Sequence, residues 1–209
     1  MNHTEPLVIT ISRQLGSGGA YIGRKLAEKL NIFYADREII SMAAKELSVL
    51  DEDLETRDEK IISFWESFLE FSAFAHDAVY MPPQQVTFPT DLELFRVESV
   101  IIERIAKERS AVIIGRCASH ILREYKNHKS IFLHGDVDFR KGRIQKLYDV
   151  SAEEAGRMIA HGDKERADYR YKFIGKDWTD TRQYSLSIDT SKIGVDKSVE
   201  LILDYLKLF

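Results

Sequence analysis

The sequence predicts a three-layer α/β fold, in which helices cover both faces of a parallel β-sheet. Short apolar runs, typical of buried strands, alternate with segments whose apolar residues recur at helical spacing. With 44% hydrophobic residues among 209, the chain can form one globular core. Ligands of such sheets bind beyond the carboxyl ends of the strands, and we expect the functional residues there.

The first part of the chain begins with an apolar strand at 7–12 and a helix at 20–30. A short strand at 31–34 and a helix at 38–47 follow. Residues 51–79 are acidic and helical in pattern, and 81–91 form a proline-containing loop. Aromatic residues of this stretch recur mainly at three- and four-residue steps, at Phe64, Trp65, Phe68, Phe71 and Phe74. Packing against the protein is the first explanation for them, and a homodimer contact is the second.

The second part of the chain continues the alternation. Ser151, with Glu154 three residues later, forms a capping-box pattern that begins one of its helices. The other expected elements are helices at 92–108, 117–125, 137–148 and 196–208 and strands at 110–114, 130–133 and 186–188. Four strand ends carry polar residues that a parallel sheet would bring to one edge, namely Ser12-Arg13, Asp36-Arg37, Gly115-Arg116 and Gly135-Asp136.

A glycine-rich turn joins the first strand to the first helix and is the main functional signal. Such a turn presents free backbone N–H groups at a helix N-terminus, where the helix dipole favours a phosphate. The alternative is a plain strand-to-helix turn, which also uses glycine. The candidate phosphate-binding residues are Gly16, Ser17, Gly18, Gly19 and Ala20.

The P-loop pattern G-x-x-x-x-G-K-[ST], laid on residues 13–20, fits this turn only in part. Gly19 stands at the lysine position, and Ala20 stands at the position of the magnesium-binding hydroxyl. We expect Arg13, at the start of the loop, to replace the lysine. Arg24, one turn into the helix, is expected to point outward.

Several segments together resemble the cytidylate kinase-like family of P-loop nucleoside monophosphate kinases. They are ISRQLGSGGAYIGRKLA, NIFYADREII, AVIIGRCASHIL, FLHGDVDFRKGRIQK, DKERADYRYKFIGKDW and SLSIDTSKIGVDKSVELIL. The resemblance implies a P-loop NTPase-like core at about 1–48 and 96–209, a helical acceptor-binding insertion at 49–95 and a lid at 150–180. It also implies a single kinase domain that uses ATP and Mg²⁺ to phosphorylate a nucleotide such as CMP or dCMP.

The resemblance assigns acceptor binding to Asp36, Arg37 and Arg116. In cytidylate kinases the arginine that corresponds to Arg116 stands within the motif Asp-Gly-Arg-Asp. This chain has Ile114 and Cys117 at the two aspartate positions. Asp36 has a second interpretation, as the N-cap of the helix at 38–47.

Basic residues before and within the lid segment supply charge for a transferred phosphate. Guanidinium groups bind two phosphate oxygens at once, which suits this task. Arg166 and Arg170, one helical turn apart, are the expected catalytic arginines besides Arg13 and would contact one anion together. Three others, Arg140, Arg157 and Lys164, are expected to be solvated surface charges.

Composition excludes several other functions. The net charge of -4 gives no general attraction to nucleic acid, and no apolar stretch reaches membrane-spanning length. The single cysteine, Cys117, excludes an internal disulfide and fits a reducing, cytoplasmic compartment. No histidine pair has metal-ligand spacing, so no protein metal site is expected.

Two alternatives to a nucleotide kinase stay open at this point. The missing lysine and hydroxyl, at Gly19 and Ala20, favour a catalytically silent nucleotide-binding module. The missing aspartates around Arg116 leave open an enzyme that acts on another anionic small molecule.

Overall fold

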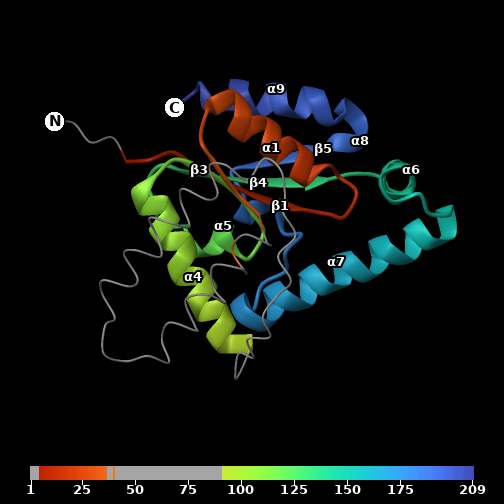
Figure 1. Cartoon of the computed structure of the whole chain (residues 1–209), viewed down its shortest axis with the longest axis horizontal. Coiled ribbons are helices and arrows are strands. Elements are labelled where there is room, and N and C mark those ends of the chain that lie inside the picture. Colours follow the sequence, from red (N-terminus) through yellow and green to blue (C-terminus); the bar gives the residue numbers. More distant parts are fainter. Residues whose placement is uncertain (1–4, 37–39, 41–90) are drawn as a thin grey trace, which may run out of the picture. The chain divides into compact units, whose positions relative to one another are not determined.

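The computed structural model describes residues 5–36, 40 and 91–209. These residues form a five-stranded sheet with the order β2-β3-β1-β4-β5, in which every pairing is parallel. The strands are β1 (Val8–Arg13), β2 (Phe33–Ala35), β3 (Ala111–Ile114), β4 (His128–His134) and β5 (Leu186–Asp189). Because all strands run the same way, their carboxyl ends lie along one edge of the sheet (Figure 1).

Helices cover both faces of this sheet, as the sequence predicts. On one face lie α1 (Gly19–Leu30) and α9 (Val195–Leu206), whereas α5 (Ala118–Ile121) and α7 (Ala152–Ile174) lie on the other (Figure 1). At the carboxyl edge, α6 (Val137–Tyr148) and α8 (Thr190–Ile193) follow β4 and β5. A 3₁₀ turn, η1 (Thr181–Gln183), precedes β5, and α4 (Asp91–Glu108) precedes β3.

The main core lies between the sheet and the helix pair α1–α9. Ile9 and Ile11 of β1 are fully buried and pack with Ile22 and Leu26 of α1. Ile202 of α9 completes the contact from the second helix. Val8, Ile9, Thr10 and Ile11 of the central strand are all buried because both faces of the strand are covered, as expected for a parallel sheet.

Helix boundaries agree with the sequence where a local signal marks them. The α6 bounds coincide with the predicted range, and the Ser151 hydroxyl accepts the Glu154 N–H at the start of α7. The expected helix at 117–125 is wrong in length, since α5 ends at Ile121. The Tyr125 N–H donates to the Leu122 carbonyl and closes a turn there, so the chain turns toward β4 three residues before His128.

Contacts divide the chain into two compact units, residues 1–36 with 103–209 and residues 37–102. The predicted insertion, 49–95, falls within the second unit. Arg37, the expected helix at 38–47, the aromatic stretch 64–74 and nearly all of the proline-containing loop lie outside the described residues. Within the described part, no helix has the length and apolar character of a membrane-spanning segment.

Candidate active site

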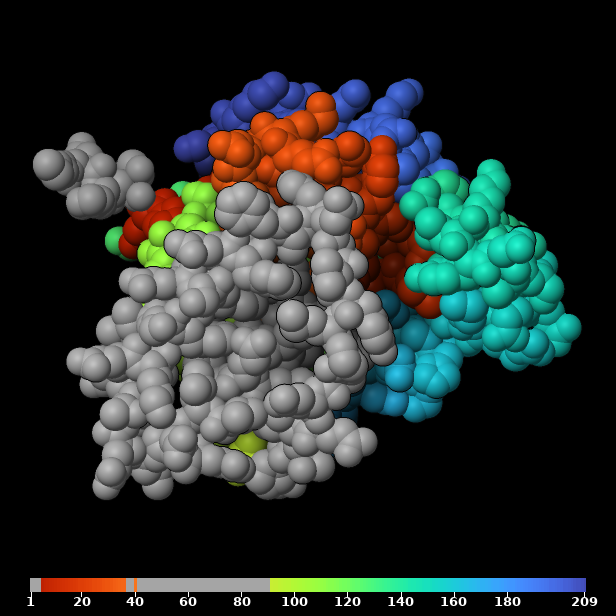
Figure 2. Space-filling view, viewed as in Figure 1, coloured from red at the N-terminus to blue at the C-terminus, as the bar shows by residue number. Residues whose placement is uncertain are grey.

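The loop after β1 has the backbone conformation of an anion-binding turn. Gly16 and Gly18 have φ values of 85° and 92°, whereas Ser17 between them is not in the left-handed region. Alternation of this kind turns successive N–H groups toward one point and makes an anion-binding concavity. In the space-filling view the loop (red) lies between α1 (orange) and the teal segment of α6 and α7 (Figure 2).

The N-terminus of α1 adds further donors at the same place. Its N-cap is Gly18, which offers no side chain to cap the helix. The first N–H groups of a helix have no intrahelical acceptor, so those of Gly19, Ala20 and Tyr21 are directed out of the helix end. Together with the helix dipole, they make this end favourable for a phosphate.

Ser17 differs from its expected role within this loop. Its side chain is buried, its hydroxyl donates to the Gln14 carbonyl at 2.8 Å, and its N–H donates to the same oxygen at 3.3 Å. Both donors therefore close the turn instead of facing a ligand. Ser17 shapes the loop, and the phosphate-facing donors are those that follow it.

Arg13, the last residue of β1, lies across the first residue of α1. A β-carbon on Gly19 would come 2.6 Å from Cγ of Arg13 and 2.9 Å from its Cβ. A β-carbon on Gly115, directly after β3, would come 2.3 Å from the Arg13 Nη1 atom. The side chain thus passes over Gly19, and its guanidinium reaches the carboxyl end of the neighbouring strand.

The turn after β3 is strained, and Arg116 is at its centre. Gly115, Arg116 and Cys117 have φ values of 76°, 49° and 55°, so three consecutive residues are left-handed. For non-glycine residues this conformation is costly and recurs at functional sites. The Arg116 guanidinium lies over the ring of Tyr169 on α7, 5.2 Å from its centroid. Arg13 and Arg116 therefore approach the same edge from neighbouring strands.

Most of the expected lid segment is the helix α7, and its two candidate catalytic arginines have different partners. Arg170 is buried, and it donates to the Ser119 hydroxyl at 3.1 Å and to the Gln183 side-chain carbonyl at 2.8 Å. Arg166 donates to the Gly162 carbonyl at 2.5 Å and turns back along α7. The two guanidinium groups thus have different surroundings, which contradicts the expectation of joint contact with one anion.

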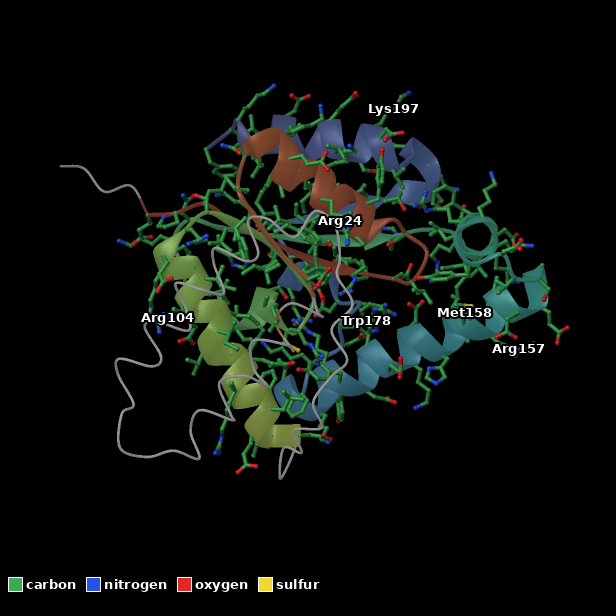
Figure 3. The ribbon with its side chains drawn as sticks, viewed as in Figure 1. Arg24, Arg104, Arg157, Met158, Trp178 and Lys197 are labelled. Atoms are coloured by element: carbon green, nitrogen blue, oxygen red, sulfur yellow. The ribbon has the colours of Figure 1, made fainter. Side chains whose placement is uncertain are left out.

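Arg140 is the clearest difference from the sequence analysis. It was expected to be solvated, yet it is only 5% exposed and forms an ion pair with Asp163 at 2.6 Å. By contrast, Arg157 and Lys164 are solvated as expected, and each pairs with exposed carboxylates on its own helix. Figure 3 shows Arg157 near the N-terminal end of α7. Sequence alone gives no signal for the difference, because the partner of Arg140 is 23 residues away.

Two further residues lie beside the loop, and the sequence singles out only Arg143, as one of the basic residues before the lid. Asp163 accepts the N–H of Leu15 at 2.8 Å. Nη2 of Arg143, on α6, lies 3.6 Å from the position that a β-carbon on Gly18 would take. The i, i+3 spacing of Arg140 and Arg143 places both on one face of α6, and that spacing is the available sequence signal.

The side chains near the loop offer a limited set of magnesium ligands. Ala20 has no side-chain oxygen, and the Asp136 carboxylate bonds to the Lys192 ammonium at 2.9 Å. That bond and the charge of Lys192 lower the pKa of Asp136. Asp36 lies 3.9 Å from Arg24, whose side chain is mostly exposed, as expected. The described residues hold no group of three or more acidic, histidine or cysteine ligands.

Several known proteins that resemble this chain in sequence are cytidylate kinases. The chain is 26% identical over 201 residues to a cytidylate kinase of Pyrobaculum aerophilum, with 95% of this chain and 92% of the relative covered. It is 28% identical over 207 residues to a cytidylate kinase of Methanopyrus kandleri, covering 94% and 91%. A match to a cytidylate kinase of Saccharolobus islandicus, at 32% identity, spans 54% of this chain and only 59% of the relative.

Solved structures show the same fold. An uncharacterized protein from Eubacterium ventriosum superposes with a TM-score of 0.71 at 26% identity, covering 96% of this chain and 98% of the other. Shikimate kinase from Bacteroides thetaiotaomicron superposes with a TM-score of 0.50 at 14% identity, over 96% and 98% of the chains. The fold is thus that of P-loop kinases. The sequence profile described as "Cytidylate kinase-like family" matches residues 8–192, and the chain belongs to that family.

Proposed function

We propose that the protein is a phosphotransferase that moves the γ-phosphate of ATP to a nucleoside monophosphate, with CMP and dCMP as the first acceptors to test. The observation that carries this proposal is the path of Arg13 over Gly19. It supplies a cation beside an uncapped helix N-terminus at the position where the P-loop lysine is absent. The family of the chain supports a nucleotide substrate.

On the donor side, the N–H groups of Gly18, Gly19 and Ala20 bind the β-phosphate of ATP. These donors need no reorganisation when charge develops on the leaving oxygens, because the helix holds them in place. The Arg13 guanidinium neutralises the transferred phosphoryl group as the lysine would. Its fork binds two oxygens at once, which also orients the group.

On the acceptor side, Arg116 binds the phosphate or base of the monophosphate. Its left-handed backbone and its contact with the Tyr169 ring fix the direction of the side chain. Asp36, directly after β2, contributes to acceptor binding, and Arg37 stays a predicted acceptor-binding residue. Arg166, on α7, stays a predicted catalytic arginine for the transferred phosphate. Arg170 acts indirectly in this scheme, because its hydrogen bonds with Ser119 and Gln183 hold α7 against the turn after β3.

Transfer of the phosphoryl group then requires alignment and charge neutralisation more than proton chemistry. The acceptor phosphate is already an anion, so no general base is needed. Mg²⁺, when bound with ATP, supplies further charge neutralisation. Ala20 provides no oxygen ligand, so this position of the chain would leave Mg²⁺ to be held through the nucleotide and water. The proposed place of action is the cytoplasm, and a homodimer stays a prediction.

A catalytically silent nucleotide-binding module is the second candidate. The loss of the lysine and of the hydroxyl, at Gly19 and Ala20, favours it. Removing one charge-stabilising donor can cost about a hundredfold or more in rate. An enzyme with another anionic acceptor is the third candidate, because Cys117 and Ile114 provide no carboxylate beside Arg116.

A turnover assay separates these candidates. The full chain is incubated with ATP, Mg²⁺ and each of CMP, dCMP, UMP and AMP, and ADP is measured together with ATP binding. ADP formed only with a monophosphate supports the proposal, whereas ATP binding without turnover favours the silent module. A second set of reactions replaces the monophosphates with anionic acceptors that are not nucleotides, such as sugar acids, and ADP formed only in this set favours the third candidate. Arg13→Ala should abolish the activity, and Arg123→Ala, which alters an exposed side chain on the same unit, should not.

A further inference from the structure

The phosphate loop is held from outside by two side chains that are distant in sequence. Oδ1 of Asp163, on α7, accepts the N–H of Leu15 at 2.8 Å. Nη1 of Arg140, on α6, donates to the Leu15 carbonyl at 3.2 Å. Both backbone groups of one loop residue are thus bonded to side chains of helices that follow it by more than 120 residues.

These two side chains also form a buried ion pair. Nη1 of Arg140 lies 2.6 Å from Oδ2 of Asp163, and the side chains are 6% and 19% exposed. Nε of Arg140 donates to the Gly135 carbonyl at 2.9 Å, so the guanidinium contacts the end of β4 as well. A buried ion pair with further hydrogen bonds is held in one geometry, because little water is available to replace its partners.

Gly16, the next residue of the loop, lies close against Arg140. A β-carbon on Gly16 would come 2.8 Å from the Arg140 carbonyl oxygen and 2.9 Å from its Cβ. On the other side, a β-carbon on Gly162 would come 3.0 Å from Cδ2 of Leu15. Leu15 and Gly16 are therefore enclosed between α6 and α7, directly before the donors that begin at Gly18.

We propose that Asp163 is a positioning residue for the donor phosphate. With Arg140, it fixes the start of the loop so that the N–H groups of Gly18, Gly19 and Ala20 converge on one point. This inference rests on the proposed function and deepens it. Asp163 also links the donor loop to α7, whose residue Tyr169 lies under Arg116.

The test compares three variants of the full chain with the wild type. Asp163→Ala removes both the acceptor for Leu15 and the partner of Arg140. Asp163→Asn keeps an oxygen for the Leu15 N–H but removes the charge. Asp168→Ala is the matched control, since Asp168 lies on the same helix and pairs only with exposed Lys164 in the described part of the chain. Binding of Mg·ATP is measured by titration, together with hydrogen exchange of peptides that cover residues 14–20 and 111–114.

We expect Asp163→Ala to weaken Mg·ATP binding at least tenfold and to speed exchange in 14–20 while exchange in 111–114 is unchanged. Asp163→Asn should be intermediate, and Asp168→Ala should resemble the wild type. With an acceptor that gives turnover, the KM for that acceptor should change less than twofold in Asp163→Asn. A general loss of stability would not weaken Mg·ATP binding while the KM for the acceptor stays nearly unchanged.

Three results would overturn the inference while the proposed function stands. One is a folded Asp163→Ala that binds Mg·ATP within twofold of the wild type, and another is faster exchange in both peptides to the same extent. If Asp163→Ala does not fold, the third result is an Asp163→Asn chain whose ATP affinity and hydrogen exchange in 14–20 equal those of the wild type. A wild-type chain that binds no ATP rejects the proposed function itself, and the donor role of Asp163 with it.

Discussion

The Arg13 side chain occupies the space that a β-carbon on Gly19 would need, with Cγ of Arg13 2.6 Å from that position. Glycine at residue 19 therefore does more than remove the P-loop lysine. It allows a strand residue to cross the helix N-terminus, and the guanidinium of that residue then reaches Gly115 after β3. Any side chain at residue 19 competes with Arg13 for the same place.

The first prediction is an energetic coupling between these two residues. Gly19→Ala should lower ATP affinity by about tenfold, because the methyl group displaces Arg13. In an Arg13→Ala background the same change should cost at least about 1 kcal/mol less, since the contact with Cγ at 2.6 Å is gone and only the approach to Cβ at 2.9 Å remains. ATP titration of the four chains gives the coupling, and additive effects would contradict the relationship.

The second prediction is that a lysine at residue 19 can replace the arginine at residue 13. Arg13→Ala with Gly19→Lys should recover part of the ATP affinity that Arg13→Ala loses, because the lysine then stands at its usual P-loop position. Gly19→Lys alone should be worse than the double variant. The control is Lys25→Ala with Arg13→Ala, since exposed Lys25 pairs with Glu28 away from the loop. Equal affinity of both double variants would argue against the substitution of lysine by Arg13.

The third prediction compares two glycines. Gly16→Ala should destabilise the protein by about 2 to 4 kcal/mol, because residue 16 has a φ of 85° and its new β-carbon would meet the Arg140 backbone. Gly142→Ala, within α6 and with no atom within 4 Å of the new carbon, should stabilise it by about 0.5 to 1 kcal/mol. Urea unfolding measures both, and a tolerated Gly16→Ala would mean that the loop is not held against α6.

The fourth prediction compares a buried arginine with an exposed one. Arg140→Met should cost about 3 to 5 kcal/mol of unfolding free energy, because the mostly buried Asp163 loses its ion pair at 2.6 Å, while Arg166 is 3.9 Å away. Arg157→Met should cost less than about 1 kcal/mol, since its partners Glu153 and Glu154 are solvated. Similar losses in the two variants, measured by urea unfolding near neutral pH, would contradict the difference in burial.

The fifth prediction is a loss of stability on the acid side caused by His128. Burial lowers the pKa of His128 to about 4, and its Nε2 lies 2.7 Å from the Thr10 hydroxyl. The ordinary pKa of histidine is about 6.5, so the unfolded chain takes up this proton first. The stabilisation is present in full above about pH 6.5 and is lost as the pH falls toward 4.

The size of this effect is on the order of 3 kcal/mol between the two limits. His128→Gln should flatten the decline in unfolding free energy between pH 6.5 and 4. His161→Gln should leave it unchanged, because His161 is exposed on α7. An acid-side slope that is identical in His128→Gln and the wild type would show that other groups cause it.

The sequence by itself determined the features that depend on neighbours along the chain. Periodicity gave the apolar central strand, the bounds of α6 and the parallel class of the sheet. The Ser151–Glu154 pattern gave the start of α7, and the glycines gave the turn before α1. Each of these rests on interactions within a few residues, where backbone geometry and side-chain spacing follow directly from the order of amino acids.

Only the tertiary structure decided which charges are buried and what they hold. Arg140 and Arg157 have the same chemistry, yet one is enclosed beside Leu15 and the other is solvated. The strand order that puts β3 beside β1 brings Gly115 to the end of the Arg13 side chain. These contacts join residues about 20 to 150 positions apart, and the free energy that selects them comes from packing and desolvation of the whole core. Spacing along the chain carries no record of that selection.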